Sequence, residues 1–307
     1  MRILVTGASG FIGNEFLKVL SGHEVTGTGL SRARQGLLPL DLTDREQVRR
    51  TMVEISPEVV IHCAARPSAD WCETHREQAR SINLLPSVAL AEECGRSRSK
   101  LVFLSTDYVF DGACGPYCET DTTGPINVYG RLKLEAEEAI KRSTRNNIIV
   151  RTTNVYGFDP ESKNFLMAML PQLARGERVR VAADQFGNPT AVSDLCAVVR
   201  ELIENGCVGT FHVTGPDWIN RAEWLRRAAG AFELDPELVA GVPTCEMDQP
   251  APRPKRSGLK SRLLDSAVSA RPLDLEAGLR AMRRDWKNHQ ALKMRTAAGP
   301  AEGAVSV

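Results

Sequence analysis

A glycine-rich turn directly after the first apolar segment constrains the fold of this chain more than any other feature. Arg2–Thr6 is a short apolar run that predicts a buried strand. Gly7, Gly10 and Gly13 follow it at intervals of three, and residues 11–21 then repeat apolar side chains with helical spacing. Because small residues let backbone amides at a helix N-terminus approach a pyrophosphate, this strand–turn–helix unit predicts dinucleotide binding.

Strands alternate with helices through the first half of the chain. Further buried strands are predicted at residues 24–28, 58–62, 100–105 and 147–151, and the helices between them include a long one from about residue 73 to 94. Such βαβ units predict an α/β fold with a doubly wound parallel sheet of the Rossmann type. Ligands of these sheets bind at the carboxyl ends of the strands.

The alternation changes after residue 153, which suggests two domains. We expect residues 1–153 and 187–213 to form the Rossmann domain that binds the dinucleotide. Residues 154–186 and 214–287 are expected to form a smaller C-terminal lobe for the substrate. Residues 288–307 are rich in Ala and Gly and have no apolar face, so they predict a flexible tail.

The residues after the second strand favour NADP(H) as the dinucleotide. An NAD site usually carries Asp or Glu here, whereas this chain has Ser31, Arg32 and Arg34, which suit a 2′-phosphate. We expect the other cofactor contacts at the glycine turn, near the adenine, and where small side chains follow the strand at 58–62. These residues are Gly7, Ser9, Gly10, Phe11, Ile12, Gly13, Asp41, Leu42, Cys63, Ala64 and Ala65.

A tyrosine and a lysine on one helix predict acid–base chemistry. Tyr129 and Lys133 are four residues apart, so their side chains share a helix face. We expect the lysine ammonium to lower the pKa of the phenol and to hold the nicotinamide ribose. Ser105 and Thr106 end the strand at 100–105, where a hydroxyl in the cleft can polarise a substrate carbonyl.

Composition argues against several classes of protein. The chain has 39 basic and 38 acidic residues and a net charge of +1, which gives no reason to expect nucleic acid or a membrane surface as a partner. We find no apolar segment of membrane-spanning length and no leader-like N-terminal segment. The eight cysteines form no Cys-x-x-Cys pair, so we expect free thiols, no metal site and a cytoplasmic location.

These motifs resemble those of the extended short-chain dehydrogenase/reductase superfamily and, more narrowly, of the dTDP-4-dehydrorhamnose reductase family. The resemblance covers residues 1–287, in the family's order. It rests on the glycine turn, Ser105–Gly112, Pro125–Gly130 with Lys133, Asp184–Thr190, and Arg253-Pro254 followed by Ser257 and Leu259.

The resemblance implies NADPH-dependent reduction of a 4-keto deoxysugar nucleotide, dTDP-linked, with a homodimer as a further expectation. It implies that Thr106, Tyr129 and Lys133 are catalytic, with hydride from the nicotinamide and a proton from Tyr129. Asn83 is expected to help hold Lys133 through a water molecule. The substrate residues are expected to be Asp107, Val109, Asn154, Gln185 and Arg253, the last because guanidinium pairs well with a diphosphate.

Two alternatives to a reductase stay open. Reductases of the family usually carry a tryptophan where this chain has Asn154, so a more polar, branched or differently oxidised sugar suits the site. The first alternative is a non-catalytic, NADP-binding regulatory subunit that resembles the β-subunit of methionine adenosyltransferase. The second is a sugar-nucleotide epimerase or dehydratase, which ranks lower because Thr106-Asp107 supplies one acid where dehydratases place two.

Overall fold

A seven-stranded parallel sheet forms the centre of the molecule. The computed structural model describes residues 1–30, 36–161 and 164–297. The strand order β11-β6-β5-β4-β1-β2-β3 reverses direction between β1 and β4, which is the point where doubly wound sheets bind ligands. The strands are β1 (Arg2–Thr6), β2 (Glu24–Gly29), β3 (Leu38–Pro39), β4 (Val59–His62), β5 (Lys100–Thr106), β6 (Asn147–Thr152) and β11 (Gly209–His212). The predicted Rossmann-type fold is therefore confirmed.

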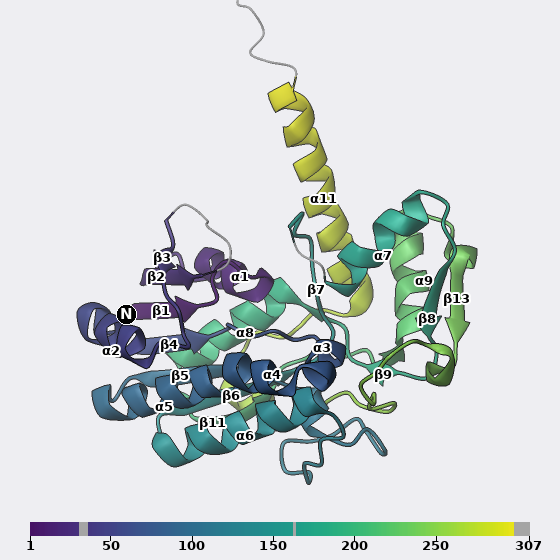
Figure 1. The fold of residues 1–307 in the computed structure, drawn as a ribbon. Coiled ribbons are helices and arrows are strands. Elements are labelled where there is room, and N and C mark those ends of the chain that lie inside the picture. Colours follow the sequence, from purple (N-terminus) through teal and green to yellow (C-terminus); the bar gives the residue numbers. More distant parts are fainter. Residues whose placement is uncertain (31–35, 162–163, 298–307) are drawn as a thin grey trace, which may run out of the picture.

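Helices cover both faces of the sheet (Figure 1). On one face lie α1 (Phe11–Val19) and α8 (Val192–Glu204); on the other lie α2 (Arg45–Ile55), α5 (Leu85–Ser97) and α6 (Val128–Ser143). Successive residues of β1 alternate between the two hydrophobic cores, Ile3 and Val5 on the α1 side and Leu4 on the α6 side. Because both faces are covered, the central strands β1, β4, β5 and β6 are mostly apolar.

A separate, smaller core lies in the lobe beside the sheet, at the right of Figure 1. Trp224 is fully buried in it and meets the edge of Tyr156 with ring centroids 5.7 Å apart. The lobe elements are α7 (Phe165–Ala174), β8 (Val179–Ala182), α9 (Arg221–Ala231), β13 (Val239–Val242) and the start of α11 (Leu275–Ala297). Short strand pairs join β7 (Val155–Tyr156) to β10 (Thr190–Ala191), β9 (Phe186–Gly187) to β12 (Ile219–Asn220), and β8 to β13.

Two predicted segments differ from the structure. The long helix expected at 73–94 is three helices: α3 (Ala69–Thr74), α4 (Arg76–Asn83) and α5. Ser68 starts α3 by accepting a hydrogen bond from the Trp71 amide, and Pro86 stands in the first turn of α5, where proline is tolerated. Helix α11 continues past Asn288, where the sequence predicts a tail, and projects beyond the rest of the chain (Figure 1). Residues 298–307 lie outside the described part.

The chain returns from the lobe to the sheet over residues 251–268. Ala251 packs into the core under α5 and α6, Leu259 contacts the cluster around Phe110, and Leu264 and Val268 join the core under α1 and α8. Short helix α10 (Leu264–Ala267) lies in this segment. We therefore propose that 251–268 belongs to the sheet domain, although the sequence places it in the lobe.

In the described ranges, no helix has the length and apolar character needed to cross a membrane.

Candidate active site

One cleft of about 1090 Å³ opens at the carboxyl ends of the central strands and reaches the lobe. It brings together most of the residues that the sequence selects, from both halves of the chain. These are Gly7, Ser9, Gly10, Phe11, Ile12, Gly13, Asp41, Leu42, Cys63, Ala64, Ala65, Thr106, Asp107, Tyr129, Lys133, Asn154, Gln185 and Arg253. Ser31, Arg32 and Arg34 lie outside the described residues.

The glycine turn has a shape that larger residues cannot take. Gly7 has φ of +71°, and a Cβ there would lie 2.6 Å from the nitrogen of Ala64, at the end of β4. A Cβ at Gly13 would lie 2.3 Å from the carbonyl oxygen of Gly7. The Gly10 amide donates to the same oxygen at 2.9 Å, which closes the turn at the start of α1. The close packing leaves backbone and a helix N-terminus to face a ligand, which fits a dinucleotide pyrophosphate.

The first turn of α6 is held tightly against the end of β5. Asn127 caps the helix by accepting a hydrogen bond from the Gly130 amide at 2.8 Å. A Cβ at Gly130 would lie 2.1 Å from the carbonyl oxygen of Tyr108, so only glycine allows this approach. Tyr129 is thereby placed beside Tyr108, with ring centroids 6.2 Å apart.

Burial perturbs both members of the Tyr129/Lys133 pair. The Lys133 ammonium donates to the Leu104 carbonyl at 2.8 Å, lies 4.4 Å from the Phe103 ring centroid, and has its pKa lowered by burial to about 8. Burial raises the pKa of Tyr129, and electrostatic interactions with the nearby Cys72, Asp107 and Tyr108 side chains raise it further. The expectation of a lowered phenol pKa is therefore wrong for the protein without its cofactor. The phenol is protonated at neutral pH and can act as a proton donor.

A buried carboxyl group supports Thr106. The Thr106 hydroxyl donates to Asp107 Oδ1 at 3.2 Å and accepts from the Tyr108 amide at 3.2 Å. Ser257 donates to Asp107 Oδ2 from the segment that returns from the lobe. Burial raises the pKa of Asp107, and the hydrogen bonds from Ser257, Thr153 and Thr106 oppose that rise. Asp107 thus orients the hydroxyl at the end of β5.

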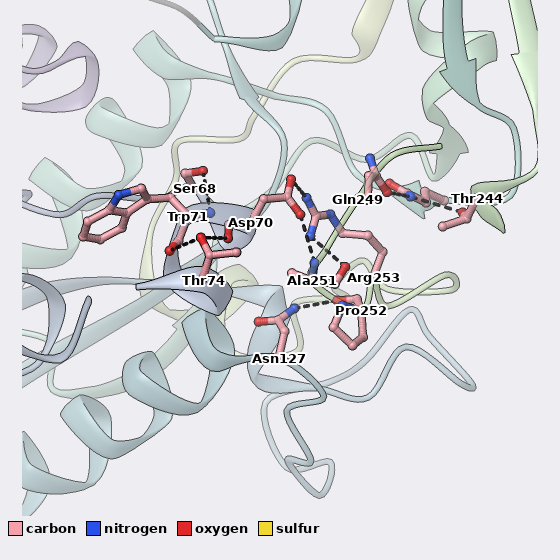
Figure 2. Close-up of polar contacts among 11 residues, drawn as sticks. Ser68, Asp70, Trp71, Thr74, Asn127, Thr244, Gln249, Ala251, Pro252 and Arg253 are labelled. Atoms are coloured by element: carbon pink, nitrogen blue, oxygen red, sulfur yellow. Dashed lines mark hydrogen bonds and ion pairs between the residues drawn. The ribbon is translucent and has the colours of Figure 1, made fainter. Parts of the chain in front are cut away.

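Arg253 is held by a carboxylate of the sheet domain (Figure 2). Its Nη2 lies 2.5 Å from Asp70 Oδ2, on α3, and its Nη1 donates to the Ala251 carbonyl at 3.0 Å. The Ala251 amide donates to the other oxygen of Asp70 at 3.0 Å. Only 9% of the Arg253 side chain is exposed, so the pair fixes the guanidinium at the wall of the cleft.

The two amide side chains on the lobe side are also positioned. Asn154 has φ of +48°, a left-handed conformation that asparagine tolerates better than most residues. A Cβ at Gly187 would lie 2.4 Å from its Nδ2, so glycine leaves room for the amide. Gln185 donates to Thr244 Oγ1 at 3.1 Å and to Gln249 Oε1 at 2.7 Å.

Two predicted site residues lie elsewhere. The side chain of Asn83 accepts from the Arg66 amide at 2.8 Å and donates to the Arg66 carbonyl at 3.3 Å, so it anchors the loop after β4. Val109 is fully buried against Phe110 and Leu259, because the short helix after Thr106 turns it away from the cleft. The burial of Val109 contradicts its predicted substrate contact, whereas the water-mediated contact of Asn83 stays a prediction.

Three features of the cleft escape the sequence analysis. Asp70 and Arg221 both line it, and Gly130 sets the distance between α6 and β5. Gly130 stands inside the quoted motif, but its contact with Tyr108 is visible only in three dimensions. Arg221 is the first residue of α9, directly after the N-cap residue Asn220. A capping residue marks the start of a helix in a sequence, so it could have indicated where Arg221 lies but not that it lines the cleft.

Known proteins share this architecture. Residues 1–287 match the family described as RmlD substrate binding domain. The chain is 33% identical over 293 residues to dTDP-4-dehydrorhamnose reductase of Mycolicibacterium smegmatis, covering 93% of this chain and 83% of that protein. It is 30% identical over 273 residues to methionine adenosyltransferase 2 subunit beta of Danio rerio, covering 86% and 84%. A crystal structure of dTDP-4-dehydrorhamnose reductase from Bacillus anthracis in complex with NADP superposes with a TM-score of 0.84 at 29% identity, covering 92% of this chain and 99% of that one.

Proposed function

The chain belongs to the RmlD substrate binding domain family, and we propose that it is an NADPH-dependent reductase of a 4-keto sugar nucleotide. The observation that carries the proposal is the meeting of Thr106, Tyr129 and Lys133 in one cleft with the glycine turn. The similarity to reductases from Mycolicibacterium smegmatis and Bacillus anthracis, the latter crystallised with NADP, supports both the reaction and the cofactor.

The residues of the cleft have distinct roles in this reaction. The turn from Gly7 to Gly13 fits the pyrophosphate of the cofactor, and Lys133 would hold its nicotinamide ribose. NADPH, when bound, supplies the hydride for the carbonyl carbon. The Thr106 hydroxyl, whose single O–H points to Asp107 in the structure, would turn that O–H to the carbonyl oxygen when substrate binds. Tyr129 gives its phenol proton to the same oxygen as the alkoxide forms. The Lys133 ammonium, charged below about pH 8, then stabilises the phenolate that remains.

Replacing Tyr129 with phenylalanine tests this assignment. We expect Tyr129→Phe to lower the rate of NADPH oxidation with a 4-keto sugar nucleotide by at least about 100-fold, because the proton donor is lost. NADPH binding, followed by fluorescence titration, should stay close to that of the parent. Tyr156→Phe is the matched control, since Tyr156 is buried in the lobe core outside the cleft. Parent-like turnover by Tyr129→Phe would refute the catalytic role.

A substrate screen separates the reductase from its main alternative. We propose dTDP as the carrier nucleotide, and dTDP- and UDP-linked keto sugars should be compared with purified protein and NADPH. The similarity to methionine adenosyltransferase 2 subunit beta fits the regulatory alternative without favouring it over the reductase. That alternative predicts NADPH binding without reduction of any sugar in the screen.

The eight thiols, all unpaired, suit the reducing cytoplasm that we propose as the location.

A further inference from the structure

Arg221 is a cation of the cleft to which the reaction above gives no role. We propose that Arg221 binds an anionic group of the substrate and so selects among sugar nucleotides. The anion is either the diphosphate or an acidic group on the sugar. This inference rests on the proposed function, because it concerns the substrate of the same cleft.

The guanidinium of Arg221 differs from those of the other two arginines that line the cleft. Arg253 is paired with Asp70, and Arg180 lies 3.1 Å from a carboxylate oxygen of Glu246. Among the described residues, no carboxylate lies within ion-pair distance of Arg221. An arginine without an acidic partner has its N–H donors and its charge available to a ligand.

An aromatic ring positions this side chain. The guanidinium carbon of Arg221 lies 5.3 Å from the ring centroid of Phe165, which also lines the cleft. Contact with a ring consumes none of the five N–H donors, so the group is placed while its hydrogen-bonding capacity stays available. The side chain is only half-buried, which leaves it accessible from the cleft.

The backbone that presents Arg221 is firmly held. Its amide donates to the Gln185 carbonyl at 3.1 Å, and Asn220 caps α9 by accepting from the Glu223 amide at 2.9 Å. The side chain therefore leaves a fixed point at the start of the helix. Gln185 lines the same cleft and is itself held by hydrogen bonds to Thr244 and Gln249, which adds to the rigidity of this wall.

The charge of Arg221 acts near the reacting end of the cleft. It opposes the burial that raises the pKa of Asp107, the neighbour of Thr106. Arg253, in contrast, is tied to α3 by Asp70. The two arginines therefore hold different parts of the cleft, and an anion that reaches Arg221 lies on the Asp107 side.

Binding measurements on the NADPH-loaded protein test the proposal. Arg221→Gln, Arg221→Lys and Arg253→Gln are titrated calorimetrically with thymidine, dTDP, UDP-glucose and UDP-glucuronate. The control is Arg227→Gln, which removes an exposed arginine paired with Glu223 on the same helix. Thermal melting shows whether Arg221→Gln is folded. If it is not, Arg221→Lys, which keeps the positive charge, replaces it in the binding measurements.

Either of two results supports the proposal and identifies the source of the anion. If Arg221 holds the diphosphate, Arg221→Gln weakens dTDP binding about 10- to 100-fold and leaves thymidine unchanged. If it holds a sugar carboxylate, the same loss appears for UDP-glucuronate and not for UDP-glucose. In both cases Arg221→Lys recovers part of the affinity and Arg227→Gln binds like the parent.

Two other results would overturn the proposal for Arg221, and they differ in whether they also refute the proposed reductase function. Parent-like binding of all four ligands by both Arg221 variants, while Arg253→Gln loses dTDP, refutes the role of Arg221 and leaves the reductase proposal intact. Failure of the parent itself to bind any nucleotide, although it binds NADPH, refutes both proposals.

Discussion

A single methyl group at residue 130 should separate the two halves of the catalytic set. In Gly130→Ala, the new carbon would lie 2.1 Å from the carbonyl oxygen of Tyr108. Ordinary C···O contacts are about 3.3 Å or longer, so the first turn of α6 and the end of β5 must move apart by about 1 Å. The atom in the way belongs to the backbone and cannot rotate aside. Tyr129 moves with α6, whereas Thr106 stays with β5.

The expected effects on rate and stability follow from this displacement. A misplacement of about 1 Å costs about 100-fold in rate, so kcat for the keto sugar nucleotide should fall by that factor. Alanine is favoured over glycine in a helix by about 1 kcal/mol, whereas overpacking costs about 1–3 kcal/mol. We expect a net loss of up to about 2 kcal/mol in the free energy of unfolding, or a fall in Tm of up to about 3 °C.

The assay combines NADPH oxidation, NADPH titration and thermal unfolding. NADPH binding should change little, because the glycine turn lies on β1 and α1. Gly230→Ala is the matched control: it lies in helix α9, where a Cβ meets no atom within 4 Å. That variant should gain up to about 1 kcal/mol and keep the parent's kcat. If Gly130→Ala instead matched the parent in both kcat and Tm, the tight fit of α6 on β5 would not control catalysis.

Two further predictions concern the cofactor turn and the buried lysine. Gly7→Ala should abolish NADPH binding, measured by fluorescence titration. The new Cβ would lie 2.6 Å from the Ala64 nitrogen, and residue 7 has φ of +71°, which alanine rarely adopts. Retained affinity for NADPH would show that the turn is not the pyrophosphate site. Burial lowers the pKa of Lys133 from 10.5 to about 8, so in this window the unfolded chain binds the proton that the folded protein has released. The free energy of unfolding of the cofactor-free protein, measured in urea titrations, should therefore rise by about 1 kcal/mol per pH unit between about pH 8 and 10, relative to that of Lys133→Met. If the free energies of unfolding of the two proteins changed equally with pH, the lowered pKa of Lys133 would be contradicted.

The fold and the centre of the site were accessible from the sequence because their signals are local. The strand pattern and the glycine turn each occupy a few consecutive residues, and parallel strands bring their carboxyl ends to one edge. Thr106 at the end of β5 and Tyr129 at the start of α6 could therefore be placed in one cleft before any coordinates. Residues that face each other only through folding had no such signal. Asp70 meets Arg253 from 183 positions away, and Arg221 enters the cleft from the lobe.

The errors have equally specific causes. Helical spacing shows that Tyr129 and Lys133 share a face, but it does not show where the ammonium points. In the structure the Leu104 carbonyl accepts its hydrogen bond, and burial of the phenol then dominates the pKa of Tyr129. Val109 follows Thr106 closely in sequence, yet one short helical turn directs it into the core. Asn83 is not an error of this kind, but its local partner, the backbone of Arg66, likewise cannot be read from any pattern.

The cap of helix α6 connects the start of the helix, where Tyr129 lies, to the segment that carries Arg253. Asn127 donates from Nδ2 to the carbonyl oxygen of Pro252 at 2.9 Å, one residue before Arg253 (Figure 2). A ligand that shifts Arg253 should therefore also shift Asn127, which lies two positions before Tyr129. We therefore expect a keto sugar without its nucleotide to be reduced at a lower kcat as well as bound more weakly.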